Sequence, residues 1–184
     1  MLEQEKNLIR KAKRGEPEAF GALYDHYHPK IYRFIFFKVG SREDAEDVAH
    51  QVFLQAWNKI GGYSHLGFPF SSWLYQIARN EVIDHYRTKK EASSIDDIDP
   101  EFFVSTANMQ FDVDQELSLN EVRNALQALR PEYADVIIMR FVEELSVREV
   151  AVALEKSEGA VKLLQYRALE ALRSVLGTKK TRES

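Results

Sequence analysis

The side chains with the clearest capacity to bind a partner gather near the end of one segment, residues 68–90. This segment reads FPFSSWLYQIARNEVIDHYRTKK, and the spacing of its apolar residues predicts one long helix. Its second half combines cations, an amide and a phenol, namely Arg79, Asn80, Tyr86, Arg87, Lys89 and Lys90. A helix that only packs against a core has no need of such a surface. The segment therefore raises the question of what partner this helix contacts.

The sequence lacks the residue arrangements that are typical of enzymes and metal sites. It contains no cysteine, which excludes disulfide bonds and thiolate ligands. It has no glycine-rich phosphate-binding loop and no HExxH pair, and its five histidines are scattered. His26 and His28 are two residues apart, so on a helix they would face different directions. We therefore predict a protein that is not an enzyme and that holds no metal and no cofactor.

The charge of the chain is unevenly distributed. The net charge is −4, but residues 91–121 contain nine acidic residues and neither Lys nor Arg. All 25 basic residues lie outside this block, which leaves the rest of the chain mildly basic. Because such asymmetry matters more for the choice of partner than the total, the acidic total does not exclude nucleic acid.

Neither a signal peptide nor a membrane span is predicted. The N-terminal sequence MLEQEKNLIRKAKRGEPEAF has no apolar run of signal-peptide type, and no segment approaches the roughly 20 apolar residues that a spanning helix needs. Hydrophobic residues make up 45% of the chain, which is enough for a packed core. We expect a soluble protein of the cytoplasm without membrane insertion.

Apolar periodicity predicts an all-α protein. In the N-terminal half, helices are expected on both sides of Pro17, with a further break or first turn at Pro29. The next helix is expected to begin at Ser41, a plausible N-cap. Ser71 or Ser72 is the expected cap of the helix in the 68–90 segment.

The helices are expected to form two small domains. Residues 91–114 lack apolar periodicity, are acidic and contain Pro100, which is typical of a linker. We therefore predict domains over residues 1–90 and 115–178, joined by a flexible acidic linker and followed by a short tail over residues 179–184.

The segment LSVREVAVALEKSEGAVKLLQYRALEAL fits a helix-turn-helix, with an ordinary helical hairpin as the alternative. Ser146 and Ser157 are expected N-caps, and Glu155 occupies the turn position that usually holds glycine. A non-glycine residue in the left-handed conformation costs about 1 kcal/mol. In this motif the second helix enters the major groove of DNA with its N-terminal residues first. The predicted contact residues are Ser157, Glu158, Gly159, Ala160, Lys162, Gln165, Tyr166 and Arg167.

Three segments, taken in this order, resemble the sigma factors of bacterial RNA polymerase of the extracytoplasmic-function (ECF) type. DAEDVAHQVFLQAW is similar to the helix of that family that binds core polymerase, and FSSWLYQIARNEVIDHYR is similar to its promoter-melting helix. The segment from LRPEYADV to ALEALR is similar to its C-terminal promoter-reading domain. The match covers about residues 5–90 and 115–176, which is nearly everything except the linker.

The resemblance implies a role for each surface. The 68–90 helix and the loop before it would hold one strand of the −10 promoter element, with cations on phosphates and rings or amides on unstacked bases. The implied residues are Tyr63, His65 and Phe70 for a base pocket, and Arg79, Asn80, Tyr86, Arg87, Lys89 and Lys90 for the strand. The helix-turn-helix would read the −35 element. The preceding helix would dock on core polymerase through Asp44, Asp47, Gln51 and Gln55.

The resemblance also implies the partners. These are core RNA polymerase, through its β′ coiled coil and its β subunit, and promoter DNA in duplex and single-stranded form. An anti-sigma factor is implied by the family alone. The alternative is a self-standing helix-turn-helix regulator whose N-terminal half senses a ligand, although such a sensor would not need the DAEDVAHQVFLQAW and FSSWLYQIARN pair.

Overall fold

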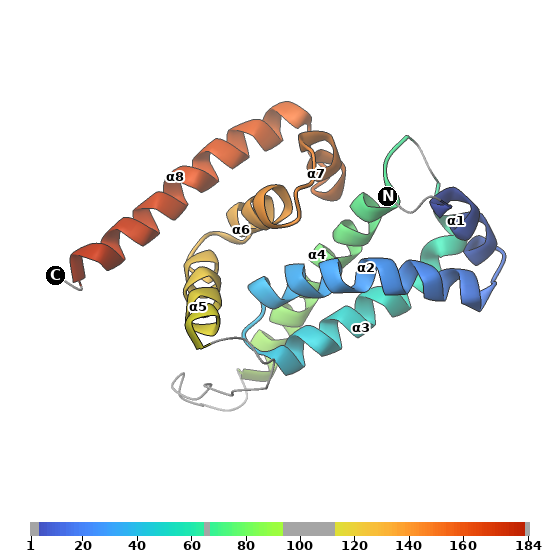
Figure 1. Ribbon diagram of the computed structural model, residues 1–184, viewed down its shortest axis with the longest axis horizontal. Coiled ribbons are helices and arrows are strands. Elements are labelled where there is room, and N and C mark those ends of the chain that lie inside the picture. The colour runs from blue at the N-terminus through green and yellow to red at the C-terminus, as the bar shows by residue number, and fades with distance from the viewer. Residues whose placement is uncertain (1–3, 65–66, 94–112, 183–184) are drawn as a thin grey trace.

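The computed structural model describes residues 4–64, 67–93 and 113–182. Every regular element within these ranges is helical, which confirms the predicted all-α class with two helical regions (Figure 1). The predicted linker lies almost entirely outside the described residues. No helix in the described part of the chain is both long and apolar enough to cross a membrane.

The N-terminal region is a bundle of four helices. These are α1 (Glu5–Lys13), α2 (Pro17–Lys38), α3 (Arg42–Lys59), which ends in the 3-10 turn η1 (Ile60–Gly62), and α4 (Phe70–Ser93). Their apolar stripes meet in a core in which Phe34, Val52 and Leu74 are fully buried. Burial of this kind, rather than intrinsic helix propensity, supplies most of the stability of such helices.

The predicted break at Pro29 is wrong, because α2 runs through it without interruption. Pro29 is exposed, so the ring and the missing N–H of the proline face solvent instead of the core. Tyr27 and Ile31 on either side are buried, and packing of these two side chains holds the helix across the proline.

The caps decide where three of the helices begin. Ser41 Oγ accepts the Asp44 N–H at 3.0 Å, and Ser157 Oγ accepts the Ala160 N–H at 3.1 Å, as predicted. Ser146 forms a full capping box with Glu149. The predicted cap of α4 is wrong: this helix begins at Phe70, whose ring packs against Tyr27, Tyr63 and Trp73, so Ser71 and Ser72 lie inside its first turn.

The C-terminal region contains α5 (Val113–Gln127), α6 (Pro131–Ile137) with its π-helical continuation η2 (Ile138–Val142), α7 (Val147–Ala153) and α8 (Glu158–Arg182). Helices α7 and α8 form the predicted helix-turn-helix. Glu155 has a φ of 54°, which confirms the left-handed turn, and the Lys156 N–H donates to the Ala151 carbonyl at 2.8 Å.

The two regions lie against each other, which the sequence did not predict. Helix α7 packs on α4, and α5 packs beside α2 (Figure 1). Charged side chains form much of this contact. Its geometry determines which of the predicted binding residues are accessible.

Candidate nucleic-acid interface

The exposed end of α4 carries most of the residues predicted to contact a DNA strand. Asn80 is exposed, Tyr86 is 45% exposed, and the Tyr86 hydroxyl donates to the Lys38 carbonyl, which fixes the ring at the surface. The Arg87 guanidinium is 3.3 Å from Asp84 on the same helix. Lys89 and Lys90 are exposed, and Lys89 Nζ lies 3.1 Å from Asp44 on α3. The structure therefore leaves a ring, an amide and cations of α4 exposed.

Arg79 belongs to α4 as well, but acidic residues of the C-terminal region hold its guanidinium. Arg79 Nε donates to Asp135 Oδ2 at 3.0 Å, and its Nη2 lies 3.9 Å from Glu132 Oε1. The side chain is only 20% exposed. Arg79 is therefore not available to a DNA phosphate in this arrangement.

The expectation of a base pocket lined by Tyr63 and Phe70 needs correction for this arrangement. Tyr63 is 7% exposed and Phe70 is 1% exposed, and their rings contact each other with centroids 5.3 Å apart. Burial raises the pKa of Tyr63 to about 12, with a smaller contribution from Glu5. Both rings are core residues because apolar surface from α2 and α4 covers them. His65 lies outside the described residues.

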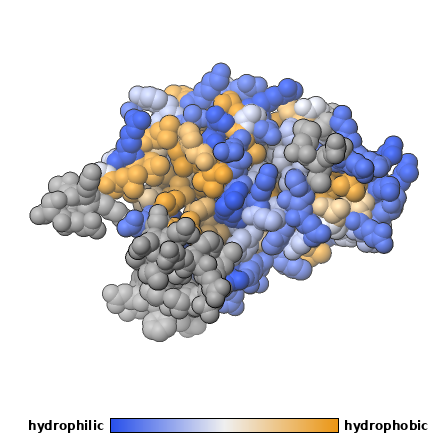
Figure 2. Space-filling model, viewed as in Figure 1, coloured by the Kyte–Doolittle hydropathy of each residue, from blue (hydrophilic) through white to orange (hydrophobic). Residues whose placement is uncertain are grey.

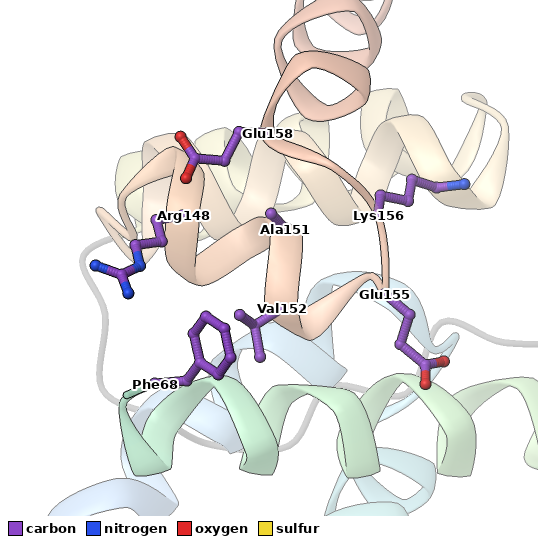
Figure 3. Close-up of a pocket in the computed structure, with 7 residues that line it drawn as sticks. All are labelled: Phe68, Arg148, Ala151, Val152, Glu155, Lys156 and Glu158. Carbon is purple, nitrogen blue, oxygen red and sulfur yellow. The ribbon is translucent and has the colours of Figure 1, made fainter. Parts of the chain in front are cut away.

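An aromatic residue that the sequence analysis did not select lies in the accessible part of the loop before α4. Phe68 is half-buried and lines an open cavity of about 600 Å³ together with residues of α7 and the α7–α8 turn (Figure 3). The Arg148 guanidinium lies 5.5 Å from the Phe68 ring centroid, a cation–π contact. In the sequence, Phe68 could have been recognised as a loop residue because it stands between Gly67 and Pro69.

The residues of α3 that are predicted to contact polymerase differ in how exposed they are. Asp47 and Gln51 are exposed, and Gln55 is half-buried. Asp44 instead faces α4, where its Oδ2 is 3.1 Å from Lys89 Nζ and 3.7 Å from His85 Nε2. The α3 surface that is open to a partner is therefore centred on Asp47 and Gln51.

The N-terminus of α8 is an accessible surface of the helix-turn-helix. Ser157, Glu158, Gly159 and Ala160 are exposed there, as are Lys162 and Arg167 one and two turns further on. Two predicted contact residues have partners within the region: Gln165 Oε1 accepts from Arg140 Nε at 2.9 Å, and the Tyr166 hydroxyl is 3.2 Å from Glu170. Tyr166 remains 62% exposed despite this contact.

Apolar side chains gather over part of the surface in Figure 2. The exposed large apolar residues of the C-terminal region come from α5, η2 and α8, and are Val122, Phe141, Leu163, Tyr166 and Leu176. Gathered apolar side chains of this kind are typical of a surface that binds another protein.

The buried carboxylates at the contact between the two regions were missed from the sequence. Asp135 and Glu143 have side-chain exposures of 2% and 0%, and both pair with cations of the N-terminal region. A signal existed for Asp135, which stands in the apolar run YADVIIM, where an acid is unexpected unless it is paired.

The comparisons with known proteins match both regions. Residues 23–92 match the family model "Sigma-70 region 2", and residues 119–172 match "Sigma-70, region 4". The ECF RNA polymerase sigma factor SigW of Bacillus subtilis is 32% identical over 93% of this chain and 96% of its own length. The ECF RNA polymerase sigma factor BldN of Streptomyces coelicolor is 36% identical over 92% of this chain, which spans 64% of BldN.

A solved structure shares the fold. The sigma factor RpoE from Bartonella quintana, in complex with the anti-sigma factor NepR, has a TM-score of 0.70 and 22% identity over 86% of this chain and 96% of that one. The relation to SigW extends through both helical regions, so the alternative of a self-standing regulator with a ligand-sensing half is set aside.

Proposed function

This chain belongs to the ECF-type sigma factors of bacterial RNA polymerase, which are non-catalytic transcription initiation factors, and we propose how its two regions divide promoter recognition. Residues 1–90 bind core polymerase and open the −10 element. Residues 115–178 recognise the −35 element as duplex. Residues 91–114 connect the two regions.

Helix α3 docks on the coiled coil of the polymerase β′ subunit. Asp47 and Gln51 carry this contact, because both side chains are exposed, one turn apart, on a helix whose other side is buried. Gln55 lies beside them, whereas Asp44 contributes by positioning Lys89 and His85 of α4.

Helix α4 holds the displaced strand of the −10 element. Asn80 and Tyr86 supply an amide and a ring for unstacked bases, and Arg79, Arg87, Lys89 and Lys90 supply charge for phosphates. Stacking of a base on an aromatic ring contributes roughly 1–3 kcal/mol. With Tyr63 and Phe70 in the core, Phe68 is the ring of the loop best placed to reach a flipped base.

Helix α8 reads the −35 element from the major groove. Its first turn is free of bulky side chains at Gly159 and Ala160, which lets the backbone approach the base edges. Lys162 and Arg167 follow on the same helix with longer donors. The exposed apolar side chains Val122 of α5, Phe141 of η2 and Leu176 near the end of α8 support a protein partner for this region, and the polymerase β subunit fits this role.

The family also supports two statements about the setting of the protein. An anti-sigma factor is the expected regulator, since the solved relative RpoE was crystallised with one. The cytoplasm is the expected location, because the polymerase that sigma factors serve works there.

The relation to SigW through both regions carries this proposal. It is tested by run-off transcription with purified core polymerase and a promoter library, with and without the protein. We expect transcripts from a small set of promoters only when the protein is added. Sequence-specific DNA binding without polymerase, together with no transcripts, would contradict the proposal and favour a self-standing regulator.

A further inference from the structure

We propose that Leu163 of α8 selects an A·T base pair in the −35 element by packing against the C5-methyl group of the thymine. The inference rests on the proposed function, in which α8 reads duplex DNA, and it adds the base pair that one side chain of this helix selects. Leu163 is absent from the contact residues predicted from the sequence, all of which are polar or small.

Two buried residues determine which side of α8 faces away from the protein. Val161 and Ala168 are both 0% exposed, and because they are seven residues apart they lie on the same side of the helix. The opposite side in this part of α8 carries Gly159, Leu163 and Tyr166, which are spaced i, i+4 and i+7 and are all exposed. Leu163 therefore points away from the body of the C-terminal region.

The surroundings of Leu163 suit DNA. Leu163 is 50% exposed, whereas the next residue, Leu164, is partly buried and packs against the hydrophobic core. Lys162 and Arg167 are exposed on the two sides of the outward face that carries Leu163. Cations at such positions bind the phosphates that border the groove, and these contacts fix the register of a helix on the duplex. Between them, Leu163 is placed toward the base edges.

The chemistry of leucine restricts what it can read there. Its side chain has no hydrogen-bond donor or acceptor. All four bases present hydrogen-bonding groups in the major groove, but only thymine also presents a methyl group. A leucine placed on a polar edge removes water from that edge without replacing the lost hydrogen bonds, which costs free energy. Against a thymine methyl it buries apolar surface on both partners. Leu163 therefore favours thymine and disfavours the other three bases.

Its position along α8 separates Leu163 from the apolar side chains assigned to a protein partner. Leu163 is the sixth residue of the helix, and a helix-turn-helix inserts the N-terminal part of its second helix into the groove. Leu176 is equally exposed, at 50%, but it follows thirteen residues later, which is about 20 Å along the helix axis. Leu163 thus belongs to the part of α8 that meets the bases, and Leu176 lies beyond it.

The test removes the methyl group from the DNA and the apolar side chain from the protein, first separately and then together. Deoxyuridine pairs as thymine does but lacks the C5-methyl group. It replaces each thymine of the −35 element in turn, on either strand, in a promoter found by the transcription library. The full-length protein is bound to core polymerase, and fluorescence anisotropy measures binding of the holoenzyme to the labelled duplex promoter. Leu163→Ala is expected to remain folded, because the position is exposed and alanine favours a helix.

We expect deoxyuridine at one position to weaken binding of the wild type by about fourfold, which is the effect of one buried methyl-sized group. Leu163→Ala should weaken binding to the unmodified promoter by a similar factor. In this variant, deoxyuridine at the same position should have no further effect. Two changes that remove the same contact are not additive, so this cycle of single and double changes identifies Leu163 and that thymine as a pair.

Leu176→Ala is the matched control, because it removes the same side chain, equally exposed, from the same helix. The control is judged by the ratio of its affinities for the thymine and deoxyuridine promoters, which should equal the ratio of the wild type. The inference would be overturned if deoxyuridine weakened wild-type binding at no position, or if Leu163→Ala kept the preference for thymine. It would also be overturned if Leu176→Ala lost this preference, or if the library selected no A·T pair in the −35 element. Each of these results is obtained on promoters that the holoenzyme transcribes, so a failure here leaves the transcription test of the proposed function unaffected.

Discussion

The turn between α7 and α8 depends on a residue in an unfavourable conformation. Glu155 has a φ of 54°, where a side chain costs about 1 kcal/mol relative to glycine. We predict that Glu155→Gly raises the free energy of unfolding by about that amount, measured by urea denaturation. Glu158→Gly is the control, because Glu158 opens α8 and glycine there weakens a helix. A loss of stability in Glu155→Gly would contradict this account of the turn.

The burial of Tyr63 allows a prediction of how the stability of the folded protein changes at alkaline pH. Burial raises the pKa of Tyr63 to about 12, whereas an unfolded tyrosine ionises near pH 10. Above pH 10 the unfolded state therefore binds fewer protons than the folded state, and stability falls as the pH rises toward 12. We predict that Tyr63→Phe loses less stability than the wild type between about pH 8 and pH 11, because phenylalanine cannot ionise.

The control for this prediction is Tyr166→Phe, which removes a hydroxyl from a side chain that is 62% exposed. Urea denaturation at the two pH values should give this control the same pH dependence as the wild type. Equal losses in Tyr63→Phe and in the wild type would show that Tyr63 is not the group that titrates.

At the level of single elements, α3 carries the proposed contact with polymerase. Asp47 and Gln51 are exposed on this helix, so their replacement leaves the core intact. We predict that Asp47→Lys combined with Gln51→Ala weakens binding to core polymerase by about tenfold or more, measured by fluorescence titration. Glu18→Lys, the same change of charge at the exposed start of α2, should bind normally. Equal affinity of the double variant and this control would refute the placement.

Most elements could be predicted from the sequence, because apolar periodicity and caps are local signals. Ser41, Ser146 and Ser157 cap the expected helices, and the left-handed turn falls at Glu155. Pro29 misled the prediction, because a proline breaks a helix only when packing on both sides does not hold it together. The start of α4 was misplaced for a similar reason, since the burial of Phe70 outweighs a serine cap.

The candidate site could be predicted only in part. The sequence identifies the cations, the amide and the rings of α4, but not which of them are accessible. Arg79 and Asp135 are 56 residues apart, and Arg33 and Glu143 are 110 residues apart, so no local pattern pairs them. Tyr63 and Phe70 look like surface rings in the sequence because their burial depends on α2, which lies far from them in the chain.

For the whole molecule, the packing of the two regions predicts how the protein behaves after cleavage. The sequence between residues 94 and 112 is polar and acidic, so we expect limited proteolysis to cut there first. The packing of α7 on α4 and the ion pairs of Asp135 and Glu143 with the N-terminal region should then keep the two fragments together on gel filtration. In Arg33→Glu the fragments should separate, since the added charge repels Glu143. Separation of the wild-type fragments, or a first cut within a helix, would contradict this packing of the two regions.

The central claim is that α4 opens DNA while α8 recognises it, and permanganate footprinting on a promoter found by the transcription library tests this directly. Permanganate reacts with unstacked thymines, so it reports strand opening by the holoenzyme. Asn80 is exposed on α4, and Arg167 is exposed on α8. We predict that Asn80→Ala binds the duplex promoter normally but fails to open it, and that a pre-melted bubble restores its activity. Arg167→Ala should bind both templates weakly. If Asn80→Ala loses duplex binding as severely as Arg167→Ala and the bubble does not restore activity, the proposed division of labour is wrong.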